Sequence, residues 1–124
     1  MSPKSKVQLA REHLERALPA VSAGDYTEAV TWLFAALEAA IVSVAGSRGI
    51  DTEKQHWKKA RVAKQLHESG ALPHDFSPTL NLLNDARKVA VYDGEEPELG
   101  NESLEDIAAD VETAVDLAER EHAR

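Results

Sequence analysis

The 124-residue sequence contains no cysteine, which excludes disulfides and thiolate metal sites. Aromatic residues are also scarce, at 5% of the chain, whereas 43% of it is hydrophobic, so small and aliphatic side chains supply most of the apolar content. Combined with many Glu, Arg and Lys residues, this composition favours helix over sheet. We therefore expect an all-α protein, and the absence of cysteine fits a reducing compartment.

Long hydrophobic segments are lacking as well. The N-terminal residues show no apolar core of a signal peptide, and the longest apolar segment, Trp32–Val44, is interrupted by Glu38. This segment is shorter than the roughly 20 residues that cross a bilayer as a helix. The expectation is a cytoplasmic protein that makes no contact with a membrane.

Positive charge is scarce in the C-terminal third. Residues 92–124 carry twelve acidic and two basic side chains, in a chain whose net charge is −8. Such a surface disfavours non-specific binding of nucleic acid over the whole molecule, but a local basic strip is still possible. Lys54, Lys58 and Arg61 align at helical spacing and form either a solvated face or a phosphate-binding strip. The solvated face is the simpler interpretation.

The apolar periodicity predicts helices throughout the chain. A chain of this length forms one domain, here with an ordered core of about residues 5–121. We expect an antiparallel, up-down four-helix bundle with an additional C-terminal helix. The predicted helices span about Lys6–Ser22, Tyr26–Ala45, Asp51–Ser69, Ser77–Asp93 and Glu102–Glu121.

The helix predicted after Phe76 has signals at both ends. Ser77 is placed to cap it, Pro78 fits its first turn, where no N–H is needed, and Gly94 provides the left-handed residue that ends it. This helix carries the most unusual residue of the chain, Arg87.

Helical spacing puts Arg87 on an otherwise apolar face with Leu80, Leu83, Asn84, Ala90 and Val91. A guanidinium on such a face requires a carboxylate, carbonyl groups, an interface partner or a bound anion, because removing the partner of a buried charge costs about 3–5 kcal/mol. Nearby polar groups that could complete a small site are Asn84, Asp85, Tyr92 and Asp93.

The sequence contains no other recognisable catalytic motif. His56 and His67 lie three helical turns apart, too far to share a metal ion, and the other histidines have no second ligand at a useful spacing. There is no glycine-rich phosphate loop and no nucleophile elbow. We expect neither a metal nor a cofactor, so an enzyme would have to be built around Arg87.

Three features together resemble the HEPN family over about residues 5–120. They are two N-terminal helices joined through Gly24–Ala29, a third helix with His56 near its start, and a late helix that ends in Asn84–Asp93. The resemblance implies a helical bundle, homodimerisation, and often an RNA-cleaving site formed by Arg-x(4–6)-His. It also implies a nucleotidyltransferase as a frequent partner in toxin–antitoxin or other defence modules.

Arg87 matches the arginine of that motif, but no histidine follows at a permitted spacing, since positions 92 to 94 are Tyr92, Asp93 and Gly94. Metal-free RNA cleavage needs a group that exchanges protons near neutral pH, and tyrosine, with an unperturbed pKa of roughly 10, does so poorly. The resemblance also raises Tyr92 as an acceptor of a nucleotidyl group from a partner enzyme.

Three hypotheses follow. The first is a homodimeric, catalytically degenerate binding module in which Arg87, Asn84 and Tyr92, with Lys58 and Arg61, contact a nucleotide, an RNA phosphate or a partner protein. The second is a metal-independent ribonuclease that uses Arg87 with Tyr92, Asp93 or a histidine of the third helix as its base. The third is a helical scaffold in which Arg87 pairs with Asp85, Asp93 or a glutamate of another subunit.

Overall fold

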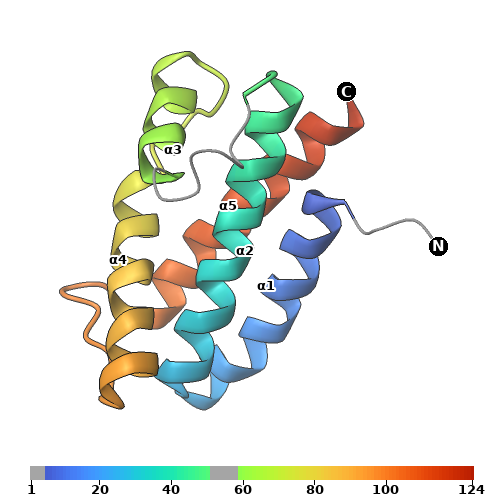
Figure 1. The fold of residues 1–124 in the computed structure, drawn as a ribbon. Helices are drawn as coiled ribbons and strands as arrows, with labels where there is room; N and C mark the ends of the chain where they lie inside the picture. The colour runs from blue at the N-terminus through green and yellow to red at the C-terminus, as the bar shows by residue number, and fades with distance from the viewer. Residues whose placement is uncertain (1–4, 51–58) are drawn as a thin grey trace.

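The computed structural model describes residues 5–50 and 59–124, and in these ranges it confirms an all-α fold (Figure 1). The start of the third predicted helix, including Lys54, His56 and Lys58, lies outside the described residues. The helices are α1 (Lys6–Ala23), α2 (Tyr26–Ser47), α3 (Lys59–Glu68), α4 (Ser77–Lys88), its continuation as a π-helical turn η2 (Val89–Asp93), and α5 (Leu104–Ala123).

Helix α2 is the centre of the bundle. It packs against α1, α4 and α5, and its Leu33, Leu37 and Ile41 are almost fully buried (Figure 1). With 22 residues and a mean hydropathy of 1.8 in its most apolar window, α2 is longer than expected and would be long enough to cross a membrane. Contacts with three neighbouring helices account for this composition without a bilayer, as in other core helices.

Helix α5, which was expected as an addition to the bundle, is an integral part of it. Its Ile107, Val111 and Val115 are buried, and it packs against both α1 and α2. The four long helices are therefore α1, α2, α4 and α5. The short helix α3 packs across one end of α2 and α4.

Most helix ends match the sequence signals, with one correction. Asp25 caps α2 by accepting a hydrogen bond from the Glu28 amide, and Gly94, with φ of 66°, follows η2. Ser77, however, is not the cap of α4. The carboxylate of Asp75 accepts the Ser77 amide at 2.9 Å, and this contact with Ser77 lowers the pKa of Asp75. The carboxylate two residues upstream, and not the serine hydroxyl, accepts a hydrogen bond from a free amide at this helix end.

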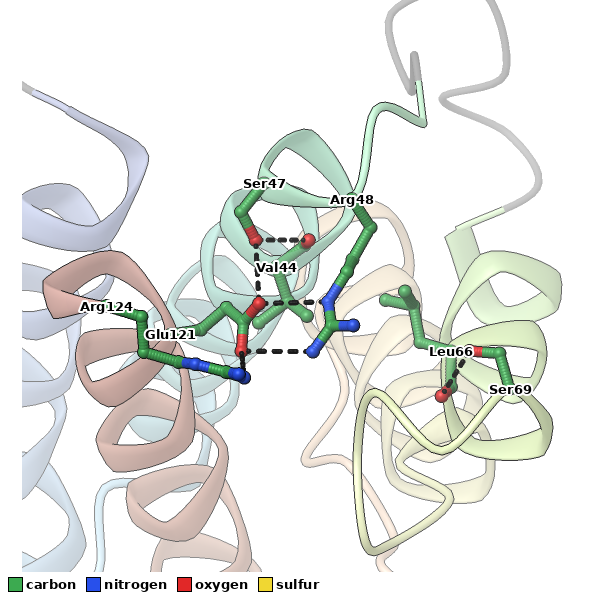
Figure 2. A network of polar contacts seen from close by, with 7 residues as sticks. All are labelled: Val44, Ser47, Arg48, Leu66, Ser69, Glu121 and Arg124. Carbon is green, nitrogen blue, oxygen red and sulfur yellow. Dashed lines mark hydrogen bonds and ion pairs between the residues drawn. The ribbon is translucent and has the colours of Figure 1, made fainter.

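Ion pairs tie α5 to its neighbours at the end of the bundle where the chain terminates (Figure 2). Arg48, just after α2, donates from Nε to Oε1 of Glu121 at 2.9 Å, while Arg124 donates to Oε2 at 3.3 Å. The hydrogen bond from Arg48 lowers the pKa of Glu121. On the other side of α5, Arg11 of α1 forms a two-pronged pair with Glu119, which raises the pKa of the guanidinium.

A stack of side chains joins α1 to α2. The ring of His13 lies 5.4 Å from that of Trp32, and the Arg16 guanidinium lies 4.9 Å from the Trp32 ring. Nδ1 of His13 is buried and has no hydrogen-bond partner in residues 5–50 and 59–124. Desolvation, with a smaller effect from the charge of Arg16, lowers the pKa of His13 below its ordinary value of 6.5. The native fold therefore holds His13 neutral.

This burial predicts a pH-dependent contribution to stability. Below pH 6.5 the unfolded chain binds a proton at His13 before the folded chain does, so the free energy of unfolding falls as the pH drops through this range. His13→Gln is expected to remove that part of the decline. Urea unfolding at pH 7.5 and pH 5.5 measures the difference, and an identical decline in the variant and the wild type would contradict the assignment.

Candidate functional site

A pocket of about 510 Å³ opens where α2, α4 and the start of α3 meet. Helix α4 contributes most of its polar lining, α2 contributes one aromatic and one acidic side chain, and α3 contributes its first two residues. The lining residues are Phe34, Glu38, Lys59, Ala60, Leu80, Asn81, Asn84, Arg87 and Lys88.

Arg87 is held in this pocket by neutral groups. One terminal nitrogen donates to Oδ1 of Asn84, one turn earlier on α4, at 3.0 Å. The carbon at the centre of the guanidinium lies 4.6 Å from the centre of the Phe34 ring on α2. The Nε atom is buried and has no hydrogen-bond partner in the described part of the chain.

These contacts fix the guanidinium without neutralising it. A cation over an aromatic face gains about 0.5–2 kcal/mol, and an amide oxygen satisfies only one of its five N–H groups. Within residues 5–50 and 59–124, no carboxylate pairs with Arg87, so the expected partners Asp85 and Asp93 do not pair with it in this chain. The geometry leaves a forked donor at the pocket wall, suited to an anion with two oxygens.

A second charged group in the pocket is the ion pair between Glu38 and Lys59. The Lys59 ammonium lies 3.1 Å from Oε1 of Glu38, and the two side chains are 17% and 33% exposed. In the sequence, Glu38 was noted as an interruption of the apolar segment of α2 and was not predicted as a site residue. This interruption could have identified it, because a carboxylate in the most apolar helix of a bundle needs a partner or a function.

Among the predicted site residues that the structure describes, Arg87 and Asn84 line the pocket together, whereas Arg61, Tyr92 and Asp93 do not. Tyr92 is 74% exposed on η2, and neither Tyr92 nor Asp93 lines the pocket. Arg61 lines a different hollow on α3 beside Lys64 and Ile50, and Lys58 lies outside the described residues.

The π-helical turn explains a further difference. Val91 was expected on the apolar face with Arg87, but it is 55% exposed. The chain from Val89 to Asp93 adopts π-helical hydrogen bonding, which holds more residues per turn than an α-helix. The α-helical register therefore ends at Lys88, and Ala90 is the only residue of η2 that stays buried.

No group of three or more metal-ligating side chains occurs among the residues that the structure describes. His67, which the sequence places too far from His56 to share a metal ion, contacts the Leu72 carbonyl through Nδ1 at 3.0 Å. His13 stacks on Trp32, and neither histidine lines the pocket.

The environment of Arg87 predicts that its charge is not needed for folding. Arg87→Met removes a buried, unpartnered Nε–H together with one hydrogen bond, so we expect the free energy of unfolding to change by less than about 1 kcal/mol. In urea unfolding, Leu83→Ala at the fully buried neighbouring position serves as the reference and should cost about 2–5 kcal/mol. A comparable loss in Arg87→Met would show that Arg87 is a structural residue.

The sequence was also compared with known proteins. A family model described as "HEPN domain" matches residues 5–121. No curated protein and no solved structure matches the chain. The match spans all five helices and includes every residue that lines the pocket.

Proposed function

Because the chain belongs to the HEPN family, we propose that it is a binding module whose Arg87 pocket holds a phosphate group of a nucleotide or of RNA. The observation that carries this proposal is the Arg87 guanidinium, which lines the pocket and pairs with no carboxylate in residues 5–50 and 59–124. An uncompensated guanidinium is costly in the free protein, and a bound phosphate would supply the missing opposite charge.

The charge of the pocket supports the same ligand. Three of its nine lining residues, Lys59, Arg87 and Lys88, are cationic, and Glu38 is the one acidic residue among them. This local excess of positive charge contrasts with the net charge of −8 of the whole chain. Asn81 and Asn84 add amide groups that can donate and accept hydrogen bonds, as base edges require.

Binding fits the pocket better than catalysis. Among the residues that the structure describes, no histidine lines it, and neither do Tyr92 and Asp93, two of the groups that the ribonuclease hypothesis needs as a base. A positioned group that exchanges a proton is required for cleavage without a metal. We therefore propose a catalytically degenerate member of the family.

The binding test compares wild type with Arg87→Ala by calorimetry, using AMP and a short 5′-phosphorylated RNA as separate probes. Because Arg87 would contribute a charge-assisted contact, we expect at least about tenfold weaker binding in the variant. Arg120→Ala, which removes an equal charge from the exposed side of α5, outside the pocket, is the matched control and should bind as wild type does.

Two results would contradict the proposal. Equal affinity of wild type and Arg87→Ala would remove Arg87 from the site. Cleavage of a mixed RNA pool in chelator, present in wild type and lost in a folded Arg87→Ala variant, would show that the protein is a ribonuclease.

We also propose that the protein forms a homodimer through the outer side of α2. Thr31, Ala35 and Val42 lie at helical spacing on one side and are only half-buried, although α2 is the most apolar helix. HEPN domains often form dimers, and a second copy on this side would bury the stripe beside the pocket. Dimerisation would thus place two Arg87 pockets close to one interface.

Light scattering tests the dimer. Ala35→Arg introduces a charge at the middle of the stripe, where a half-buried side chain leaves room in the monomer. We expect wild type to have the mass of two chains and the variant the mass of one, with unchanged helical circular dichroism. A monomeric wild type, or a variant that stays dimeric, would exclude this interface.

We propose a cytoplasmic role in a toxin–antitoxin or other defence module, with a nucleotidyltransferase as the partner. The exposed Tyr92 is accessible to such an enzyme, and the acidic C-terminal third offers a surface to a basic partner.

A further inference from the structure

The carboxylate of Glu38 lies in a pocket that is otherwise suited to an anion, and this combination has a specific consequence for the ligand. Resting on the proposed phosphate site, we infer that Glu38 selects ribonucleotides over deoxyribonucleotides by accepting a hydrogen bond from a ribose hydroxyl. Arg87 would bind the phosphate, and Glu38 would bind the sugar of the same ligand.

Glu38 is held in place by its partner. Lys59 binds Oε1 at 3.1 Å and is only 17% exposed, so the carboxylate is fixed at the wall between α2 and α3. Within the described residues, Oε2 of Glu38 accepts no hydrogen bond. An ionised carboxylate only accepts hydrogen bonds, so this free oxygen needs a donor.

The phosphate cannot be that donor. A carboxylate repels a phosphate dianion, and it therefore lowers the affinity of the pocket for phosphate alone. A ribose, in contrast, offers two neighbouring hydroxyl groups, and acidic side chains commonly hold the 2′-hydroxyl in nucleotide sites. The cavity of about 510 Å³ falls within the range of pockets that hold small-molecule ligands.

Two opposite effects of one side chain follow. Removal of Glu38 takes away a repulsive charge, so inorganic phosphate should bind more tightly. The same change removes the acceptor for the sugar, so the preference for a ribonucleotide over its 2′-deoxy analogue should disappear. A side chain that merely stabilised the fold would weaken the binding of all three ligands together.

The experiment measures binding of AMP, 2′-deoxy-AMP and inorganic phosphate by calorimetry to the full chain. Wild type is expected to prefer AMP over 2′-deoxy-AMP by about tenfold, the value of one hydrogen bond to a charged group. Glu38→Ala should bring this ratio close to one and bind phosphate more tightly than wild type does. Glu38→Gln, which keeps the shape and one acceptor oxygen, should retain part of the preference.

Glu112→Ala is the matched control, because it removes one negative charge from the exposed side of α5, outside the pocket. Its AMP to 2′-deoxy-AMP ratio should equal that of wild type. Circular dichroism confirms folding, and Glu38→Gln keeps the test valid if Glu38→Ala does not fold.

The outcomes separate this inference from the proposed function. If wild type binds AMP and 2′-deoxy-AMP equally and Arg87→Ala binds neither, the phosphate site stands and the role of Glu38 is overturned. The role is also overturned if Glu38→Ala keeps the wild-type ratio. If wild type binds none of the three ligands, both the phosphate site and the sugar contact are rejected.

Discussion

The burial of α2 by α1, α4 and α5, with α3 across one end, is the interaction on which the rest of the structure depends. Each neighbouring helix covers a different part of its apolar surface, and the short α1–α2 turn fixes the first of these contacts. Helix α4 owes its position to Leu80 and Leu83, which are buried in the same core. Because the next turn of α4 carries Arg87, the packing of these leucines places the guanidinium against Phe34 of α2.

The pocket therefore arises at the edge of the core. Towards the core, Phe34 and Leu80 give it an apolar wall, and towards solvent, Lys88 gives it charge. Arg87 lies at the boundary, with one nitrogen satisfied by Asn84 and another buried atom left unpaired. A site of this kind gives up part of its own electrostatic stability in the free state and recovers it when a ligand of opposite charge binds.

The sequence was sufficient to predict the helices, because their apolar spacing and end signals agree. Gly94 acts as expected at the helix end. It was also sufficient to single out Arg87, since a charge on an apolar face is visible in the helical period alone. The structure reverses two local expectations: Asp75 takes over the capping role of Ser77, and the π turn exposes Val91. Both depend on backbone hydrogen bonding that side-chain periodicity does not encode.

The apolar periodicity of the sequence could not predict the contacts of Glu38. Its role depends on which helix lies opposite α2, and thus on the contact between residues 38 and 59, which are distant in the sequence. The role of Phe34 is equally hidden in the sequence, where it has the pattern of an ordinary core residue. Its contact with the Arg87 guanidinium appears only in the structure. Such pairings between elements follow from the tertiary arrangement, whereas each helix taken alone is compatible with several partners.

The uneven distribution of charge has a kinetic consequence. From Val89 to Glu119 the chain contains eleven carboxylates and no basic side chain, whereas α3 carries Lys59, Arg61 and Lys64. Helix α3 lies at one end of the bundle, whereas the acidic segment starts in η2 at the opposite end and continues along α5 (Figure 1). An anion diffusing towards the protein is repelled from the acidic end and drawn towards α3, beside the mouth of the pocket. The productive encounters with a phosphate-bearing ligand would therefore come from one direction, and their frequency would fall as added salt shortens the reach of the field.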